Sequence, residues 1–388
     1  MVEFMRKILS VLLIYSFSLV LLSSCGGKPE QEDTPSSTDF NQYLNSQSFY
    51  GCTDRGWYIW NNEQIYFLDD GLTATPTVLC AKADCSHTDP NTCSSYLSNG
   101  IYASNNTLYY LNMPQDGKGI DLCQMGSDGQ DRKVLSNLFP EADNYSYVAN
   151  GGGGYLTVAL SEYTVNGDVT TLYLISLADP TAEPAVLFSN AEQVEAALGD
   201  TSQIPRPYVM HVGEEWVFYN VESGPTGSRS NSLYGYEIAT GETKLLVEDT
   251  FFIGGDLSPV GDVLYWYDTD GSTYGQLNKI DLENGAITLV QDIPIGADVW
   301  GTLDDKYLYV SGGSAAEPAD LVVYDFEGNE LQRLSCEELG MPISYAFSDD
   351  SKVVFRSFDL GQTMPVCWVD KDELAEGKAE FHLIDPEG

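Results

Sequence analysis

The chain has 388 residues and carries 18 Lys+Arg against 58 Asp+Glu, which gives a formal net charge of -40 at pH 7. A field of that sign repels phosphate backbones and anionic lipid surfaces, so nucleic acid is a poor candidate partner. The hydrophobic content of 43%, with 25 Tyr and 15 Phe, excludes a disordered chain and favours all-β structure. The acidic residues are spread through expected turns and strand ends, which favours solubility over a dedicated cation- or sugar-binding face.

The N-terminus has the pattern of an export signal. Arg6 and Lys7 precede an apolar stretch, residues 8–22, that is too short for a comfortable membrane span. The stretch ends in Leu-Ser-Ser-Cys at residues 22–25, which resembles the lipobox of bacterial lipoproteins and implies cleavage before Cys25 and lipid on its thiol. The alternatives are an ordinary secretory signal with a chance cysteine and an uncleaved anchor. We expect an exported protein, lipid-anchored to the outer face of the bacterial cytoplasmic membrane or cell surface.

Paired β-rich runs recur along the rest of the chain. Residues 233–248, 277–291 and 321–334 each have the pattern of a strand, an acidic or Gly-containing turn and a second strand. The outer hairpins are expected to begin near Ile65, Leu122, Leu172, Leu233, Leu277, Leu321 and Val366, and the last three intervals are 44, 44 and 45 residues. Repeats of this period predict an all-β fold, a β-propeller of seven four-stranded blades. Six or eight blades stay open as alternatives, because the first blade is hard to delimit.

Between these hairpins lie the expected inner strand pairs, at residues 100–112, 147–160, 209–220, 255–268, 300–313 and 345–358. Most of them have a polar turn between strands rich in Tyr, Phe, Val or Trp. Helical patterns are confined to residues 191–198 and 336–339. A ring must close, and residues 40–50 are expected to add a strand to the last blade, because such a strand removes a free sheet edge.

The expected domain organisation has three parts. Residues 1–24 form a lipoprotein signal peptide, and residues 25–44 form the lipidated cysteine and a disordered tether, because residues 26–39 are polar with no apolar side chain to bury. Residues 45–388 form a single β-propeller domain with a Cys-rich insertion at about residues 79–96. No later segment is apolar enough to cross a membrane.

The Cys-rich insertion holds the one local motif with specific chemistry, which consists of Cys80, Cys85, His87 and Cys93. Three thiols and one imidazole are a ligand set of tetrahedral Zn²⁺, although C-x4-C-x-H-x5-C is not a common zinc-finger spacing. The rival interpretation is a set of disulfides, because exported thiols meet oxidising conditions, and reduced structural cysteines are the third. Seven cysteines remain beside Cys25, so at least one thiol stays unpaired unless a metal or an intermolecular bond takes it.

The run VLCAKADCSH at residues 78–87, followed by Cys93, resembles an element of uncharacterised β-propeller lipoproteins of Gram-positive bacteria. Those proteins are similar in layout, with a lipoprotein signal, a polar tether and a propeller of TolB-like or LRP-like repeats that has a Cys-rich segment after its first blade. Ala83 stands where they usually have proline. Residues 257–261 and 347–350 resemble TolB-type turns. The resemblance implies a surface-located propeller and supplies no catalytic residues.

Common enzyme motifs were not found. The three histidines are His87, His211 and His382, and the sequence contains neither H-E-x-x-H nor G-x-S-x-G. His211 is interpreted as a strand-end histidine rather than a metal ligand or a general base. The GGGG run at residues 151–154 is interpreted as a hairpin turn rather than a phosphate cradle. The DTDGS run at residues 268–272 is interpreted as a β-turn rather than a calcium loop.

These patterns predict a non-catalytic lipoprotein that uses a propeller face to bind or scaffold protein, peptide or glycan ligands. One alternative is a carbohydrate-active hydrolase or lyase, which needs a central pocket with two carboxylates and facing aromatics. Trp300 is the candidate for stacking on such a sugar, although core packing is its default interpretation. The other alternative is a metal-binding surface protein. No cofactor is expected apart from Zn²⁺ at Cys80, Cys85, His87 and Cys93.

Overall fold

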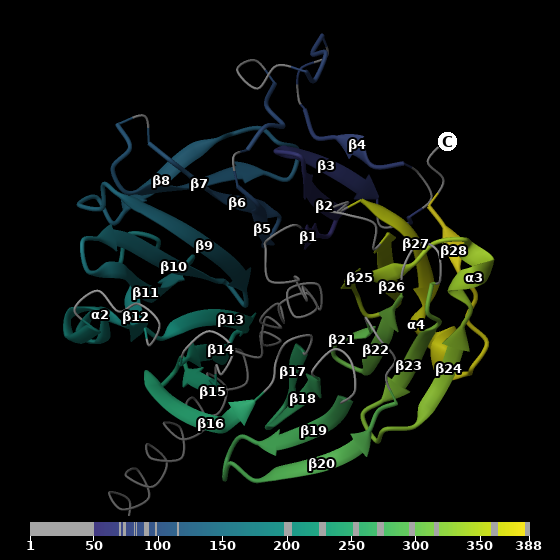
Figure 1. Ribbon diagram of the computed structural model, residues 1–388. Helices are drawn as coiled ribbons and strands as arrows, with labels where there is room; N and C mark the ends of the chain where they lie inside the picture. The colour runs from purple at the N-terminus through teal and green to yellow at the C-terminus, as the bar shows by residue number, and fades with distance from the viewer. Residues whose placement is uncertain are drawn as a thin grey trace, which may run out of the picture. The chain divides into compact units, whose positions relative to one another are not determined.

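The computed structural model describes residues 50–384, with gaps at residues 70, 73–74, 81, 83, 89–92, 98, 115, 198–203, 225–229, 251–255, 270–274, 295–298, 314–317 and 358–363. The described residues form seven sheets of four strands each. Within each sheet the strand order follows the chain order, and every neighbouring pair is antiparallel. The sheets are arranged in a ring as blades, with the first strand of each blade toward the middle (Figure 1). The predicted seven-bladed β-propeller is therefore confirmed.

The first four blades occupy residues 50–250. Blade 1 contains β1 (Tyr50–Thr53), β2 (Gly56–Asn61), β3 (Gln64–Asp69) and β4 (Thr77–Val78). Blade 2 contains β5 (Ile101–Ser104), β6 (Thr107–Asn112), β7 (Ile120–Gly126) and β8 (Lys133–Leu138). Blade 3 contains β9 (Tyr145–Gly152), β10 (Tyr155–Thr164), β11 (Gly167–Ser176) and β12 (Ala185–Ser189). Blade 4 contains β13 (Arg206–Val212), β14 (Trp216–Ser223), β15 (Ser230–Glu237) and β16 (Glu242–Thr250).

The last three blades occupy residues 256–383. Blade 5 contains β17 (Asp256–Val260), β18 (Val263–Thr269), β19 (Gly275–Asp281) and β20 (Ile287–Asp292). Blade 6 contains β21 (Val299–Leu303), β22 (Tyr307–Gly312), β23 (Leu321–Asp325) and β24 (Glu330–Leu334). Blade 7 contains β25 (Ile343–Ser348), β26 (Lys352–Ser357), β27 (Pro365–Asp370) and β28 (His382–Leu383). The described helices are α2 (Ala191–Ala197), α3 (Cys336–Leu339) and α4 (Lys371–Ala375), and none of them is long and apolar enough to span a membrane.

The repeat was predicted in the correct register. All seven expected hairpin positions lie in the third strand of a blade, namely β3, β7, β11, β15, β19, β23 and β27. The helices predicted at residues 191–198 and 336–339 correspond to α2 and α3. The inner pair of blade 1, β1 and β2, was not predicted. Neither was α4, a five-residue helix whose first amides are capped by the Asp370 carboxylate.

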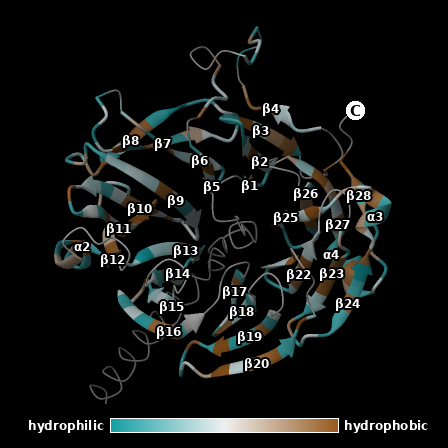
Figure 2. Ribbon diagram, in the orientation of Figure 1, coloured by the Kyte–Doolittle hydropathy of each residue, from teal (hydrophilic) through white to brown (hydrophobic). Residues whose placement is uncertain are grey.

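The hydrophobic core lies between the blades, where seven clusters of buried apolar side chains each join two neighbouring blades. Figure 2 shows the apolar residues mainly along the strands. Both faces of each four-stranded sheet are therefore covered, which explains why the sequence shows β-rich runs in every blade rather than one apolar centre.

The expectation that residues 40–50 would add a strand to the last blade is wrong for Tyr50, which begins β1 of blade 1. Residues 40–49 lie outside the described residues. Blade 7 takes all four of its strands from residues 343–383, so this blade needs no N-terminal strand. Side chains close the ring instead: the Phe347 ring stacks on Trp57 at 4.0 Å and lies 5.1 Å from the ring of Tyr50.

The GGGG run at residues 151–154 ends β9 and turns into β10, which agrees with the predicted hairpin. Gly153 and Gly154 form the turn with φ of 54° and 77°, values that favour glycine. Gly152 is needed for another reason, because a Cβ there would lie 1.8 Å from the carbonyl oxygen of Val212 in blade 4. At Gly151 a Cβ would lie 2.4 Å from the ring of Tyr102 in blade 2. The run therefore allows blade 3 to approach both of its neighbours.

Replacing Gly152 with Ala should destabilise the ring far more than replacing Gly154 with Ala. The first change forces a methyl group into the backbone of blade 4, and we expect it to lower the free energy of unfolding by about 3 kcal/mol or more. A Cβ on Gly154 meets nothing within 4 Å, so only its positive φ matters and the loss should be about 1 kcal/mol. Urea unfolding of both variants measures the difference, and equal losses would contradict the proposed close approach.

Candidate functional site

The four residues of the predicted motif converge in the structure. Cys80, Cys85, His87 and Cys93 lie in the segment between β4 and β5, and their three Sγ atoms and one imidazole nitrogen all lie within 4.8 Å of one another. The Cys93 Sγ atom is 3.6 Å from His87 Nδ1. The predicted lipidation site, Cys25, lies outside the described residues.

The two ends of this segment are fixed to the same part of blade 1. The Leu79 amide donates to the Ile65 carbonyl at 2.9 Å, and the Ile65 amide donates to the Ser95 carbonyl at 2.9 Å. The Leu97 amide then donates to the Glu63 carbonyl at 2.8 Å. The segment therefore leaves blade 1 and returns to it, which brings Cys80 near Cys93 although thirteen positions separate them.

The backbone of His87 is held in an uncommon conformation. Its φ is 57°, in the left-handed region, and its carbonyl accepts hydrogen bonds from Gln64 Nε2 at 2.8 Å and from the Tyr96 hydroxyl at 3.4 Å. The Gln64 side chain is buried at the start of β3. These contacts fix the main chain that carries the imidazole, as outer-shell contacts do in metal sites.

Two of the thiols receive hydrogen bonds from the serines that follow Cys93. The Ser94 hydroxyl donates to Cys80 Sγ at 3.4 Å, and the Ser95 amide donates to Cys93 Sγ at 3.5 Å. The Ser95 hydroxyl also lies 2.9 Å from Cys93 Sγ. Donors aimed at sulfur stabilise the thiolate, which is the form that binds metals.

The pKa of Cys80 reflects these donors. Burial raises the pKa of this thiol, but hydrogen bonds from the Ser94 hydroxyl, the backbone at Lys82 and Ser94, and the Cys85 thiol outweigh burial and lower the pKa to about 6. Cys80 is also partly exposed. A partly exposed thiol with a lowered pKa is both a reactive nucleophile and a ready metal ligand.

The other members of the cluster have shifted pKa values as well. Burial raises the pKa of Cys93, but the Ser95 hydroxyl and amide outweigh burial and lower it. A hydrogen bond at the His87 backbone lowers the pKa of Cys85, yet burial and the neighbouring thiols of Cys93 and Cys80 outweigh it and raise the pKa. The pKa of His87 is raised, chiefly by the hydrogen bond to Cys93. In the metal-free cluster, Cys80 and Cys93 therefore lose their protons at a lower pH than Cys85 does.

The arrangement fits a metal ion better than a disulfide. Zinc–sulfur bonds of about 2.3 Å place two ligands of a tetrahedral ion about 3.8 Å apart, so a small contraction of the cluster would suffice. A disulfide joins only two sulfur atoms and would leave the third thiol and the imidazole without a role. All seven described cysteines are free thiols, and four of them are buried outside this segment, namely Cys52, Cys123 and Cys367 in blade strands and Cys336 at the start of α3.

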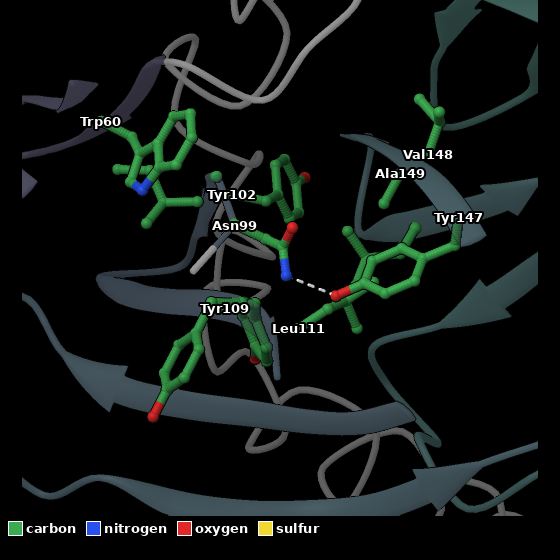
Figure 3. Close-up of a pocket in the computed structure, with 12 residues that line it drawn as sticks. Trp60, Asn99, Tyr102, Tyr109, Leu111, Tyr147, Val148 and Ala149 are labelled. Atoms are coloured by element: carbon green, nitrogen blue, oxygen red, sulfur yellow. Dashed lines mark hydrogen bonds between the residues drawn. The ribbon is translucent and has the colours of Figure 1, made fainter. Parts of the chain in front are cut away.

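A pocket of about 220 Å³ lies beside this segment, between blades 2 and 3. Its lining is formed by Trp60, Asn99, Gly100, Ile101, Tyr102, Tyr109, Tyr110, Leu111, Tyr147, Val148, Ala149 and Leu156. Figure 3 shows Trp60 and Tyr147 on opposite sides, with the Asn99 side chain between them. Five of the lining residues are aromatic and none carries a charged side chain.

Hydrogen bonds position the polar groups of the pocket. Asn99 Nδ2 donates to the Tyr147 hydroxyl at 2.5 Å, and Trp60 Nε1 donates to the Leu97 carbonyl at 3.0 Å. The Gly154 amide donates to the Tyr102 hydroxyl at 3.1 Å, so the glycine run of blade 3 also orients a pocket residue. Burial raises the pKa of Tyr147, and the phenol is therefore neutral. The pocket offers aromatic faces, hydroxyl groups and an amide.

The sequence patterns did not predict this pocket. Trp60, not Trp300, is the tryptophan in it, and Trp300 is half-buried in β21 of blade 6. His211 lies in β13, where burial lowers its pKa to about 4, as expected for a neutral strand histidine. His382 lies in β28 and its ring stacks on Trp368 at 4.2 Å. Neither histidine belongs to the cluster of Cys and His ligands.

The chain was compared with known proteins. No protein-family model matches the sequence, and no curated protein sequence matches it either.

Among solved structures, a prolyl endopeptidase matches with a TM-score of 0.52 and 14% sequence identity, over 89% of this chain and 50% of that one. The chain thus spans about half the length of that structure. An oligogalacturonate lyase in complex with manganese matches with a TM-score of 0.49, 13% identity and coverage of 84% and 89%. TolB from Acinetobacter baumannii matches with a TM-score of 0.35, 12% identity and coverage of 87% and 79%. At 14% identity, the match to the prolyl endopeptidase shows a shared fold alone.

In metal-free protein, Cys80 should react with iodoacetamide at neutral pH well before the buried cysteines. Its pKa of about 6 makes it mostly thiolate at pH 7, whereas burial raises the pKa of Cys336 to about 11 and that of Cys367 to about 12. Peptide mapping by mass spectrometry between pH 5 and 8 should show half-maximal Cys80 labelling near pH 6. Equal labelling of Cys80 and Cys336 at pH 7 would contradict the described environment.

Proposed function

We propose that the protein is an exported, lipid-anchored binding module that takes a part of its ligand into the aromatic pocket between blades 2 and 3. The observation that carries this proposal is the lining, which combines five aromatic rings with hydroxyl and amide groups and has no charged side chain. Ligand-binding sites in general have this make-up, with apolar walls and a few placed polar groups.

The size of the pocket limits what enters it. At about 220 Å³ it is smaller than sites for drug-sized ligands, which have about 300–1,000 Å³. It accommodates a group of about one sugar ring or one amino-acid residue. We therefore infer that the ligand is a larger protein, peptide or glycan that inserts one such group, while its other parts lie on the propeller surface.

The charge of the protein narrows the ligand class further. A net charge of -40 repels anions, and the lining offers no cation to hold one. The inserted group is therefore not an anion. A glycosidase would instead need two carboxyl groups beside the ligand, and the lining contains none.

Export and lipid anchoring rest on the N-terminal sequence. The apolar stretch of residues 8–22 and the lipobox-like run before Cys25 support processing as a bacterial lipoprotein, as do the uncharacterised Gram-positive propellers that this chain resembles. An anchored propeller would present its pocket outside the cytoplasmic membrane.

Replacing Tyr109 with Ala should weaken ligand binding about tenfold or more, because buried aromatic side chains dominate binding energy. The ligand would be obtained by probing peptide and uncharged glycan arrays with the mature chain. Tyr208→Ala is the matched control, since this tyrosine is 48% exposed on blade 4 and lies outside the pocket. Titration of the array hit with both variants measures the effect. Normal binding by Tyr109→Ala would exclude the pocket as the place where this ligand binds.

Replacing Cys25 with Ser should abolish the incorporation of labelled palmitate into the chain when it is expressed in a bacterial host. The thiol that would carry the lipid is then missing, whereas the apolar stretch of residues 8–22 can still hold an unprocessed chain at the membrane, so lipid is measured rather than membrane retention. Cys52→Ser, a change in β1, should incorporate palmitate as the unchanged chain does. A Cys25→Ser protein that still incorporates palmitate would refute lipid anchoring at this residue.

A second candidate function, metal binding, is favoured by the four ligand atoms that lie within 4.8 Å of one another. Thiolate and imidazole ligands suit Zn²⁺, so zinc is the ion we propose for Cys80, Cys85, His87 and Cys93. Three thiolates this close together repel one another, and the net charge of -40 adds to that repulsion. A cation among them would remove this destabilisation.

Protein purified without chelator or reductant should contain about one zinc per chain, measured by elemental mass spectrometry. Cys93→Ser should lose the metal because it removes one thiolate ligand. His87→Cys should retain it, because four thiolates are also a zinc set. Equal zinc content in all three proteins would place the metal elsewhere.

A further inference from the structure

The cysteine–histidine cluster and the aromatic pocket share one stretch of chain. Ser95, which contacts Cys93 Sγ through both its amide and its hydroxyl, is bonded through its carbonyl to blade 1. Two residues later, the Leu97 carbonyl accepts the indole N–H of Trp60 at 3.0 Å. Trp60 lines the pocket. The backbone that follows the last ligand therefore holds a pocket side chain in place.

A second link runs through Arg132. Its guanidinium donates a hydrogen bond to the carbonyl of Ser94, the residue whose hydroxyl donates to Cys80 Sγ. The same guanidinium lies over the Tyr110 ring, 5.5 Å from its centroid. Tyr110 lines the pocket. The cluster thus contacts the pocket through two independent side chains, Trp60 and Arg132.

In the described part of the chain, few contacts besides the hydrogen bonds from Gln64 and Tyr96 to the His87 carbonyl hold the segment that carries the ligands. Among the described residues from 80 to 93, Cys93 has the only buried side chain, while Cys80, Cys85 and His87 are partly exposed. A short segment without its own hydrophobic core depends on cross-links or a metal for a fixed shape. Its two anchored ends lie at Leu79 and Leu97, outside the ligand set.

We infer that an ion bound by Cys80, Cys85, His87 and Cys93 has a structural role, and that it fixes the side of the pocket formed by Trp60 and Tyr110, so that pocket occupancy by ligand depends on metal. This inference rests on the proposed binding function of the pocket. Four protein ligands leave no open position on a tetrahedral ion, so the ion would not touch the ligand itself. Its effect would pass through the Leu97–Trp60 and Ser94–Arg132 contacts, with a coupling of about tenfold in affinity.

The test compares the mature protein with and without Zn²⁺, using zinc alone as the probe. Hydrogen exchange of residues 94–101 should slow about tenfold or more when zinc binds, and a chelator should reverse the change. The fluorescence of Trp60, obtained as the difference from a Trp60→Phe variant, should shift in parallel. Cys85→Ser should lose zinc and both responses. Cys367→Ala, which changes a buried cysteine of blade 7, should keep them.

Three outcomes separate the proposals. Zinc binding that slows exchange only within residues 80–93, with Trp60 unchanged, would overturn the coupling and leave the metal site standing. Failure to bind zinc would overturn the inference and the metal site together, and would leave the binding function untouched. If zinc slows residues 94–101 but Tyr109→Ala binds the array ligand normally, the metal-fixed wall is supported and the pocket is not where that ligand binds.

Discussion

Apolar contact between neighbouring blades is the interaction on which the rest of this molecule depends. Each of the seven hydrophobic clusters takes its side chains from two adjacent blades. A single four-stranded blade would leave both of its faces exposed to water, so it has no reason to be stable alone. The blades therefore stabilise one another around the ring. The Gly151–Gly152 contacts show how closely adjacent blades must approach for this to work.

The fold could be predicted where the repeat is regular and not where its strands or helices are very short. The hairpins that begin at Leu233, Leu277, Leu321 and Val366 are evenly spaced because the loops between those blades are short. The first strand of blade 1 has only four residues, YGCT, one of which is a glycine, so local pattern does not reveal it. Helix α4 has five residues and is too short to show a helical period.

The candidate site also has one part that the sequence predicts and one part that it does not. The cysteine–histidine cluster could be predicted because its four ligands lie within fourteen residues, and a loop that returns to its own blade must bring them together. The pocket could not, because Trp60, Tyr109 and Tyr147 come from β2, β6 and β9 in three different blades. Their proximity follows from how the blades pack, and each of these aromatics alone has the pattern of an ordinary strand residue.

The way the ring closes has a mechanical consequence. The contact between blades 7 and 1 consists of side chains such as Phe347, Trp57 and Tyr50, and all four strands of blade 7 come from the C-terminal end of the chain. Strand β1 begins at Tyr50 and pairs with β2 through four residue pairs. Tension applied from the N-terminal side therefore reaches this joint first. A pulled ring would open between blades 7 and 1 and unroll from blade 1 onward, so its resistance to force depends on the aromatic contacts of Phe347, the ladder between β1 and β2, and the packing of β1 against β5.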